Sequence, residues 1–155
     1  MAEEKTYLSK EKVEDLKKEL EYLKTEKRKE VADSLEYARS LGDLSENAEY
    51  QEAGRLQSEV EDRIANVESM LRSAIIVSDY KGGVINIGST VVVLKENDQS
   101  RSTYKIVGSE EADMSQGKIS NRSPLGAALI GKKKDERTVV KTPNGEVSYL
   151  VVSVE

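Results

Sequence analysis

A repeating apolar pattern in the first half most strongly constrains how this chain can fold. Apart from one longer step, its members recur at intervals of three and four residues, the spacing of a heptad seam. They are Val13, Leu16, Leu20, Leu23, Val31, Leu35 and Ala38. No glycine or proline occurs from residue 2 to residue 41. The spacing therefore predicts one helix over about 9–41, roughly 50 Å long, with Ser9 as its N-cap.

This seam has one irregularity. The position after Leu23 falls on Lys27, and the apolar residues resume only at Val31. The extra four-residue step is expected to unwind a supercoil locally.

A second apolar series follows Gly42 and predicts a second helix over about 44–75. Its members are Ala53, Leu56, Val60, Ile64, Val67, Leu71 and Ala74. Because only a few residues separate the two helices, we expect antiparallel neighbours that bury their seams together. The prediction for residues 1–77 is a long antiparallel coiled-coil hairpin. Periodicity alone leaves open a purely structural hairpin or a dimerisation module.

The composition changes after the loop at 78–83, and the second half is typical of a small sheet domain. Runs of β-branched residues predict strands at 89–95, 102–107, 137–142 and 146–154. Ser123 and Pro124 open a short helix, which Gly131 ends. Gly145 supplies a positive φ for a tight hairpin after Pro143 and Asn144. The predicted class is α+β.

Composition and charge exclude several function classes. The chain has no His and no Cys, which excludes a Ser-His-Asp triad and a cysteine zinc site. A bound metal would need oxygen ligands, which favours Mg²⁺, Ca²⁺ or Mn²⁺. Residues 1–77 carry a net charge of −6 and residues 78–155 a net charge of +1. The acidic half argues against tight or sequence-specific DNA binding and favours a protein partner.

The ends and the hydropathy pattern indicate the compartment. The first residues contain no apolar h-region of a secretory signal. No stretch approaches the ~18 apolar residues of a membrane span. We therefore expect a cytoplasmic protein without a membrane partner.

The junction at 42–50, Gly-Asp-Leu-Ser-Glu-Asn-Ala-Glu-Tyr, is the most informative segment. Asp43, Glu46 and Glu49 are spaced by three, so on a helical turn they share a face. In one interpretation Asp43 is the N-cap of the second helix and Glu46 completes a capping box. In the other, two carboxylates at the end of a long hairpin are ligands of a Mg²⁺ ion shared with a molecule that holds a phosphodiester. The position at the hairpin's far end favours the second.

Four segments together resemble one protein family. They are residues 7–23, the junction 42–50, Ser-Pro-Leu-Gly-Ala-Ala-Leu-Ile-Gly-Lys at 123–132, and Lys-Thr-Pro-Asn-Gly-Glu-Val at 141–147. The chain resembles the bacterial Gre-type transcript cleavage factors over nearly its whole length. Its pI of about 5.1 favours the less basic, GreA-like branch.

The resemblance implies a partner and a mechanism. The globular domain at 78–155, similar to the FK506-binding prolyl isomerase fold, would dock on RNA polymerase near its secondary channel. The hairpin tip would pass down the channel to the nascent RNA 3′ end. There Asp43 and Glu46 would help to hold a second Mg²⁺ ion in the polymerase active site. The polymerase would then cleave its own transcript, so the chain itself would not be an enzyme.

The resemblance also assigns supporting residues at the tip. Those expected to position the loop, the RNA or the polymerase are Arg39, Ser45, Asn47 and Tyr50. Ser45 departs from the family pattern, which often has a basic residue there. A basic residue that the family carries early in the second helix falls on Gly54, with Arg55 one place along and turned by about 100°.

Three other functions compete with this one. A prolyl isomerase would need an aromatic-lined pocket, and the second domain has no Phe or Trp and only Tyr80, Tyr104 and Tyr149. A channel-occupying inhibitor of the same architecture would alter the acidic tip, which this chain keeps. A generic coiled-coil adaptor would not bind the polymerase.

Overall fold

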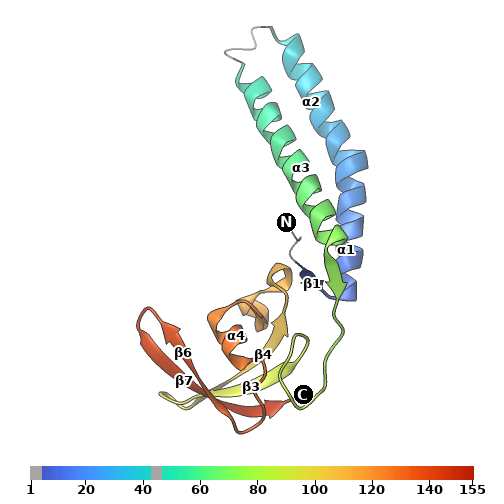
Figure 1. Ribbon diagram of the computed structural model, residues 1–155. Helices are drawn as coiled ribbons and strands as arrows, with labels where there is room; N and C mark the ends of the chain where they lie inside the picture. The colour runs from blue at the N-terminus through green and yellow to red at the C-terminus, as the bar shows by residue number, and fades with distance from the viewer. Residues whose placement is uncertain (1–4, 43–46) are drawn as a thin grey trace. The chain divides into compact units, whose positions relative to one another are not determined.

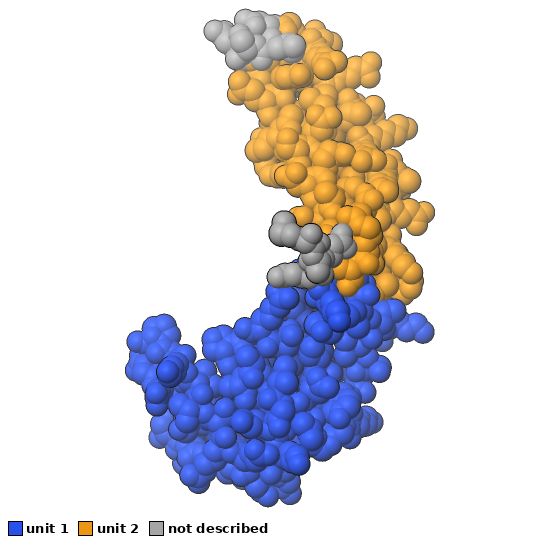
Figure 2. Space-filling view, viewed as in Figure 1, with its two compact units in different colours: residues 1–12, 74–155 blue, residues 13–73 orange. Residues whose placement is uncertain are grey.

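The computed structural model describes residues 5–42 and 47–155. They form two compact units (Figure 2): one contains residues up to Lys12 together with Ala74–Glu155, and the other is Val13–Ser73. Helices make up most of the N-terminal part and a sheet most of the C-terminal part (Figure 1), which confirms the α+β class. The predicted domain boundary between residues 77 and 78 stays a prediction.

The first predicted helix consists of three consecutive helical segments. They are α1 (Lys10–Tyr22), the π-helical turn η1 (Leu23–Lys27) and α2 (Arg28–Ser40). Ser9 is confirmed as the N-cap, because its Oγ accepts a hydrogen bond of 3.1 Å from the backbone N–H of Lys12. The second helix is α3 (Ala48–Arg72), which lies beside α2 and η1 (Figure 1).

The buried side of this helix pair is the predicted seam. Leu23 and Val31 pack with Val60 and Ile64 in one cluster. Partly buried residues extend the cluster along both helices: Leu20, Leu35 and Leu56. Each fully buried aliphatic side chain of this size stabilises the fold by about 1.5–3 kcal/mol. The seam is therefore the main source of stability for the helix pair.

Ion pairs cross the helix interface at its edges. Arg28 donates to both carboxylate oxygens of Glu61, at 2.9 and 2.7 Å. Arg63 binds Glu19, with an Nη2–Oε1 distance of 2.8 Å. The hydrogen bond from Arg28 lowers the pKa of Glu61. Because Arg28 and Glu61 are exposed and Arg63 and Glu19 are only partly buried, the pairs add little stability, but their two-point geometry favours one antiparallel register.

The π-helical turn lies at the irregularity of the seam. The carbonyl oxygen of Leu23 accepts from the backbone N–H of Arg28, five residues on. At about 100° per residue, the eight steps from Leu23 to Val31 overshoot two turns by about 80°. A π turn takes up one extra residue, which reduces the mismatch to about 20°, that of an ordinary heptad. The turn therefore returns Val31 to the buried face.

A short parallel pair was not predicted. β1 (Thr6–Leu8) pairs with β2 (Ala74–Ile76), Tyr7 lying opposite Ile75. The prediction that the second helix continues to residue 75 is wrong, because α3 ends at Arg72 and the next residues are extended. Strands of three residues are too short to show an alternating pattern. The apolar spacing that continues to Ala74 in the sequence hid this change.

The main sheet has five strands in the order β5-β4-β3-β7-β6. Four match the predicted ones: β3 (Thr90–Lys95), β4 (Ser100–Val107), β6 (Arg137–Thr142) and β7 (Gly145–Val154). The fifth, β5 (Lys118–Ser120), pairs in parallel with β4 and was missed. Two short 3₁₀ helices precede it: η2 (Ser109–Glu111) and η3 (Met114–Gln116).

One helix packs on this sheet. α4 (Pro124–Leu129) begins as predicted, because Ser123 Oγ accepts from the backbone N–H of Gly126 at 3.0 Å. Leu129 is buried in the sheet core with Val91, Ile106 and Val151. A Cβ at residue 126 would lie 2.0 Å from the carbonyl oxygen of Ser120. Glycine is thus required for the close approach of α4.

The predicted turn between the last two strands is also confirmed. β6 and β7 are antiparallel, and Thr142 pairs with Gly145 across the turn. Gly145 has a φ of 120°, a conformation that L side chains rarely adopt. In the part of the chain that the structure describes, no helix is both long and apolar enough to span a bilayer.

The π turn makes a deletion testable. Removing Thr25, an exposed residue within η1, should convert this segment into a regular α-helix and leave the seam in phase. We expect the midpoint of thermal unfolding, followed by circular dichroism, to change by less than about 3 °C. Deleting Ser58 from the regular helix α3 is the matched control and should lower it by roughly 5–10 °C, because it rotates part of the seam. Equal losses would contradict a phase-correcting role.

Candidate functional site

The candidate site begins with the contact that joins the two helix ends. Asn47 has an extended backbone and lies directly before α3. Its side-chain oxygen accepts from the backbone N–H of Tyr50 at 3.1 Å. Its side-chain nitrogen donates to the carbonyl oxygen of Ala38 in α2 at 2.6 Å. One amide therefore caps α3 and also ties its start to the last turns of α2.

This geometry tests one of the two interpretations of the acidic junction, the capping box. Asn47 is the N-cap of α3, whose first residue is Ala48. The hypothesis that Asp43 caps the second helix is therefore wrong. Asp43, Ser45 and Glu46 lie outside the described residues, so their predicted roles stay predictions.

The other predicted tip residues lie on both helices. Arg39 is exposed in the last turn of α2, and Tyr50 is half-buried in the first turn of α3. Asn47 lies between them in the sequence and in contact with both helices. The structure thus brings the three residues to one end of the helix pair, while their predicted contacts with RNA or polymerase stay predictions.

Gly54 and Arg55 stand where the family pattern has a basic residue early in the second helix, and the structure shows the surroundings of both. A Cβ at Gly54 would meet no atom within 4 Å. The guanidinium of Arg55 is held by two carboxylates of its own helix, Glu52 and Glu59. The hydrogen bond that Arg55 donates to Glu52, with the nearby negative charges, raises the pKa of Arg55. Arg55 is thus engaged with carboxylates of α3 itself.

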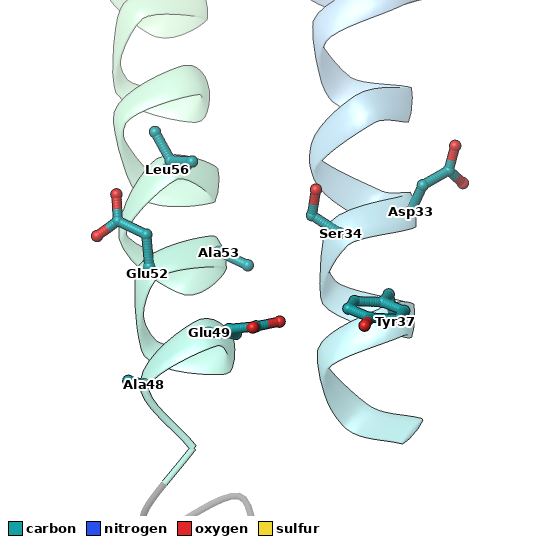
Figure 3. A pocket seen from close by; sticks show the side chains of 8 residues that line it. All are labelled: Asp33, Ser34, Tyr37, Ala48, Glu49, Glu52, Ala53 and Leu56. Carbon is teal, nitrogen blue, oxygen red and sulfur yellow. The ribbon is translucent and has the colours of Figure 1, made fainter. Parts of the chain in front are cut away.

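A groove lies between α2 and α3 beside this end (Figure 3) and was missed by sequence reasoning. We call it the tip groove. It is lined by Asp33, Ser34, Tyr37, Ala48, Glu49, Glu52, Ala53 and Leu56. Glu49 extends from α3 toward α2, whereas Asp33 and Glu52 lie on opposite sides. The signal in the sequence is Tyr37, an aromatic residue outside the seam.

The described residues do not themselves form a metal centre. Within residues 5–42 and 47–155, no group of three or more Asp, Glu, His or Cys side chains could hold a metal ion. The carboxylates of the tip groove are thus not arranged as a common ligand set. The predicted magnesium ligands, Asp43 and Glu46, are outside these ranges, and the Mg²⁺ site stays a prediction.

Comparisons with known proteins cover both halves of the chain. The family description "Transcription elongation factor, N-terminal" matches residues 6–76, and "Transcription elongation factor, GreA/GreB, C-term" matches residues 80–155. The chain is 46% identical over 158 residues to transcription elongation factor GreA of Bacillus cytotoxicus, covering 100% of both chains. It is 47% identical over 156 residues to the GreA of Bacillus subtilis, covering 99% of both.

Solved structures of the same kind are more distant. A crystal structure of the GreA factor homolog 1 protein of Thermus thermophilus is 27% identical, with 98% of this chain and 99% of that chain covered and a TM-score of 0.45. Family membership therefore rests on the sequence matches.

The two roles of Asn47 can be separated by substitution. Asn47→Ala removes both contacts and should lower the free energy of unfolding by about 1–3 kcal/mol. Asn47→Asp caps as well but cannot donate to Ala38, so we expect a loss of about 0.5–1.5 kcal/mol. Urea unfolding monitored by helix content would measure both. If Asn47→Asp were as stable as the parent, the contact with Ala38 would contribute nothing.

Proposed function

The chain belongs to the GreA/GreB family of transcription elongation factors, and we propose that it rescues backtracked RNA polymerase by stimulating the polymerase's own cleavage of the nascent transcript. It is a transcription elongation factor, matched to GreA over its whole length. Its partner is RNA polymerase, on which factors of this family act.

The observation that carries the proposal is the N-cap of α3. Because Asn47 fills the capping position, the start of α3 does not need Asp43 as its cap. The same amide ties α3 to Ala38 of α2, so the residues between them in the sequence join two helix ends that are held together. Freedom of the acidic pair from the capping role supports a role in contacting another molecule.

The donor chemistry of this pair fits Mg²⁺. Carboxylate oxygens are the ligands that Mg²⁺ prefers, and one or two carboxylates usually suffice when phosphates and waters complete the shell. In the proposal, Asp43 and Glu46 would hold a Mg²⁺ ion together with the polymerase. When bound, such an ion supplies charge stabilisation for phosphoryl transfer. The catalytic centre belongs to the polymerase, and the chain is not itself an enzyme.

The remaining parts of the proposal concern how the chain reaches that centre. The helix pair would wind as a coiled coil and enter the secondary channel of the polymerase, with the tip at the RNA 3′ end. The heptad spacing of the buried seam supports the coiled coil. The C-terminal sheet unit would dock on the polymerase. Its five strands and one packed helix are compatible with a fold similar to the FK506-binding proteins.

Substitution of the acidic pair tests the mechanism. Asp43→Asn and Glu46→Gln each remove one negative charge with little change of shape. A charge-assisted contact of about 1.5–3 kcal/mol predicts a roughly tenfold to hundredfold loss of cleavage rate. The assay is release of short 3′-labelled RNA fragments from a stalled, backtracked elongation complex at saturating factor. Because both groups would serve one ion, the double variant should be scarcely worse than the poorer single variant.

The controls separate chemistry from folding and docking. Asp62→Asn removes an exposed carboxylate from α3 outside the tip groove and should cleave like the parent. All variants should keep parental helix content and polymerase affinity, and raised Mg²⁺ should partly restore cleavage. The metal-holding role would be refuted if Asp43→Asn cleaved at the parental rate. It would also be refuted if the losses of cleavage rate in the two single variants multiplied in the double variant and did not respond to Mg²⁺.

A further inference from the structure

The tip groove combines an exposed aromatic ring with an apolar floor. Tyr37 is 61% exposed although it is a large side chain on a regular helix. Ala53 is buried and Leu56 is partly buried against the seam cluster. An aromatic face beside apolar surface accommodates the aliphatic stem of a long side chain and attracts a cation at its end.

The charges around the groove are all of one sign. Asp33, Glu49 and Glu52 line it, and no Lys or Arg does. Glu52 is paired with Arg55, which lies outside the lining. Within the described ranges, Asp33 and Glu49 form no ion pair with another side chain. The groove therefore has two unpaired carboxylates beside an accessible ring, which disfavours a phosphate or an RNA backbone.

The spacing of these carboxylates narrows the choice of cation. They do not form a cluster that could hold a metal ion, in the part of the chain that the structure describes. Figure 3 shows Glu49 reaching between the helices, with Asp33 and Glu52 diverging to the two sides. Separated carboxylates beside a ring suit an extended guanidinium or a lysine side chain, which can contact the ring face and one carboxylate at once.

We propose that the tip groove binds an Arg or Lys side chain of RNA polymerase, with Tyr37 under the cation and Glu49 as its counter-charge. This inference rests on the proposed function, because that function supplies the partner. It adds a contact on the helix pair that is separate from the acidic residues of the junction. The contact would contribute to holding the helix pair in its place on the polymerase, and not to the cleavage step.

Binding of the full chain to bacterial core RNA polymerase tests this proposal. The dissociation constant is measured by fluorescence anisotropy of a labelled chain at low and moderate salt. We expect Tyr37→Leu and Glu49→Gln each to weaken binding by about three- to tenfold. The loss for Glu49→Gln should shrink as salt rises, because screening weakens the ion pair in the parent.

Matched controls distinguish a cation site from general surface effects. Tyr37→Phe keeps the ring and should bind like the parent. Glu36→Gln removes a carboxylate next to Tyr37 in sequence but outside the groove lining, and should also bind like the parent. Parental affinity of either Tyr37→Leu or Glu49→Gln would overturn the proposal, as would a loss in Tyr37→Phe equal to that in Tyr37→Leu.

Cleavage and mass measurements separate the remaining outcomes. At saturating concentration, Tyr37→Leu and Glu49→Gln should cleave at the parental rate, unlike Asp43→Asn. If the parent bound polymerase but released no RNA fragment, the proposed function would fail. The affinities of Tyr37→Leu and Glu49→Gln relative to the parent would still test the groove proposal. If light scattering showed a parental dimer that Tyr37→Leu dissociates, the occupant would be a second copy of this chain and the proposal would be wrong.

Discussion

The helix pair depends on keeping one narrow apolar stripe of each helix facing the other. Its buried cluster is built from seam positions alone, Leu23 and Val31 on one side and Val60 and Ile64 on the other. Isolated helices of this kind are marginal in water, so each helix needs the partner's stripe. The rotational phase of both helices must therefore be maintained from end to end, and the π turn and the ion pairs across the interface serve that requirement.

The same requirement explains why the junction uses an amide and not an acid at the helix start. A carboxylate could accept from the backbone N–H of Tyr50, but it could not donate to the carbonyl oxygen of Ala38. Asn47 does both, which holds the helix ends together without adding charge. The acidic residues of the junction are then not needed for the cap. The structural role at this end of the helix pair is thus filled by Asn47.

Local patterns account for what could be predicted from the sequence. Heptad spacing predicted the buried seam, and runs of β-branched residues predicted four strands of the main sheet. Ser123 predicted the start of a helix and Gly145 predicted a turn, because N-capping and a positive φ each favour a few residue types.

Features that depend on distant contacts could not be predicted. β1 and β2 have three residues each, too few to show a pattern of their own. They pair although the whole helix pair separates them in the sequence. The tip groove exists only because Tyr37 and Glu49 come together from two helices. For the candidate site, the family resemblance predicted which residues belong to the tip. It could not predict the double contact of Asn47, because that contact depends on where the backbone atoms of Ala38 and Tyr50 lie. The seam also concealed the end of α3, since Ala74 keeps the apolar spacing after the helix has stopped.

The π turn has a consequence for how chains of this kind can diverge. In a packed helix, gaining or losing one residue normally rotates everything beyond it, so selection removes such changes. At Leu23–Lys27 an added residue is held as a local widening of the helix, and the downstream face is preserved. Lineages can therefore differ in length by one residue here without compensating changes elsewhere. In an alignment of relatives, a single-residue gap in this segment would mark a change of length that the fold can accommodate.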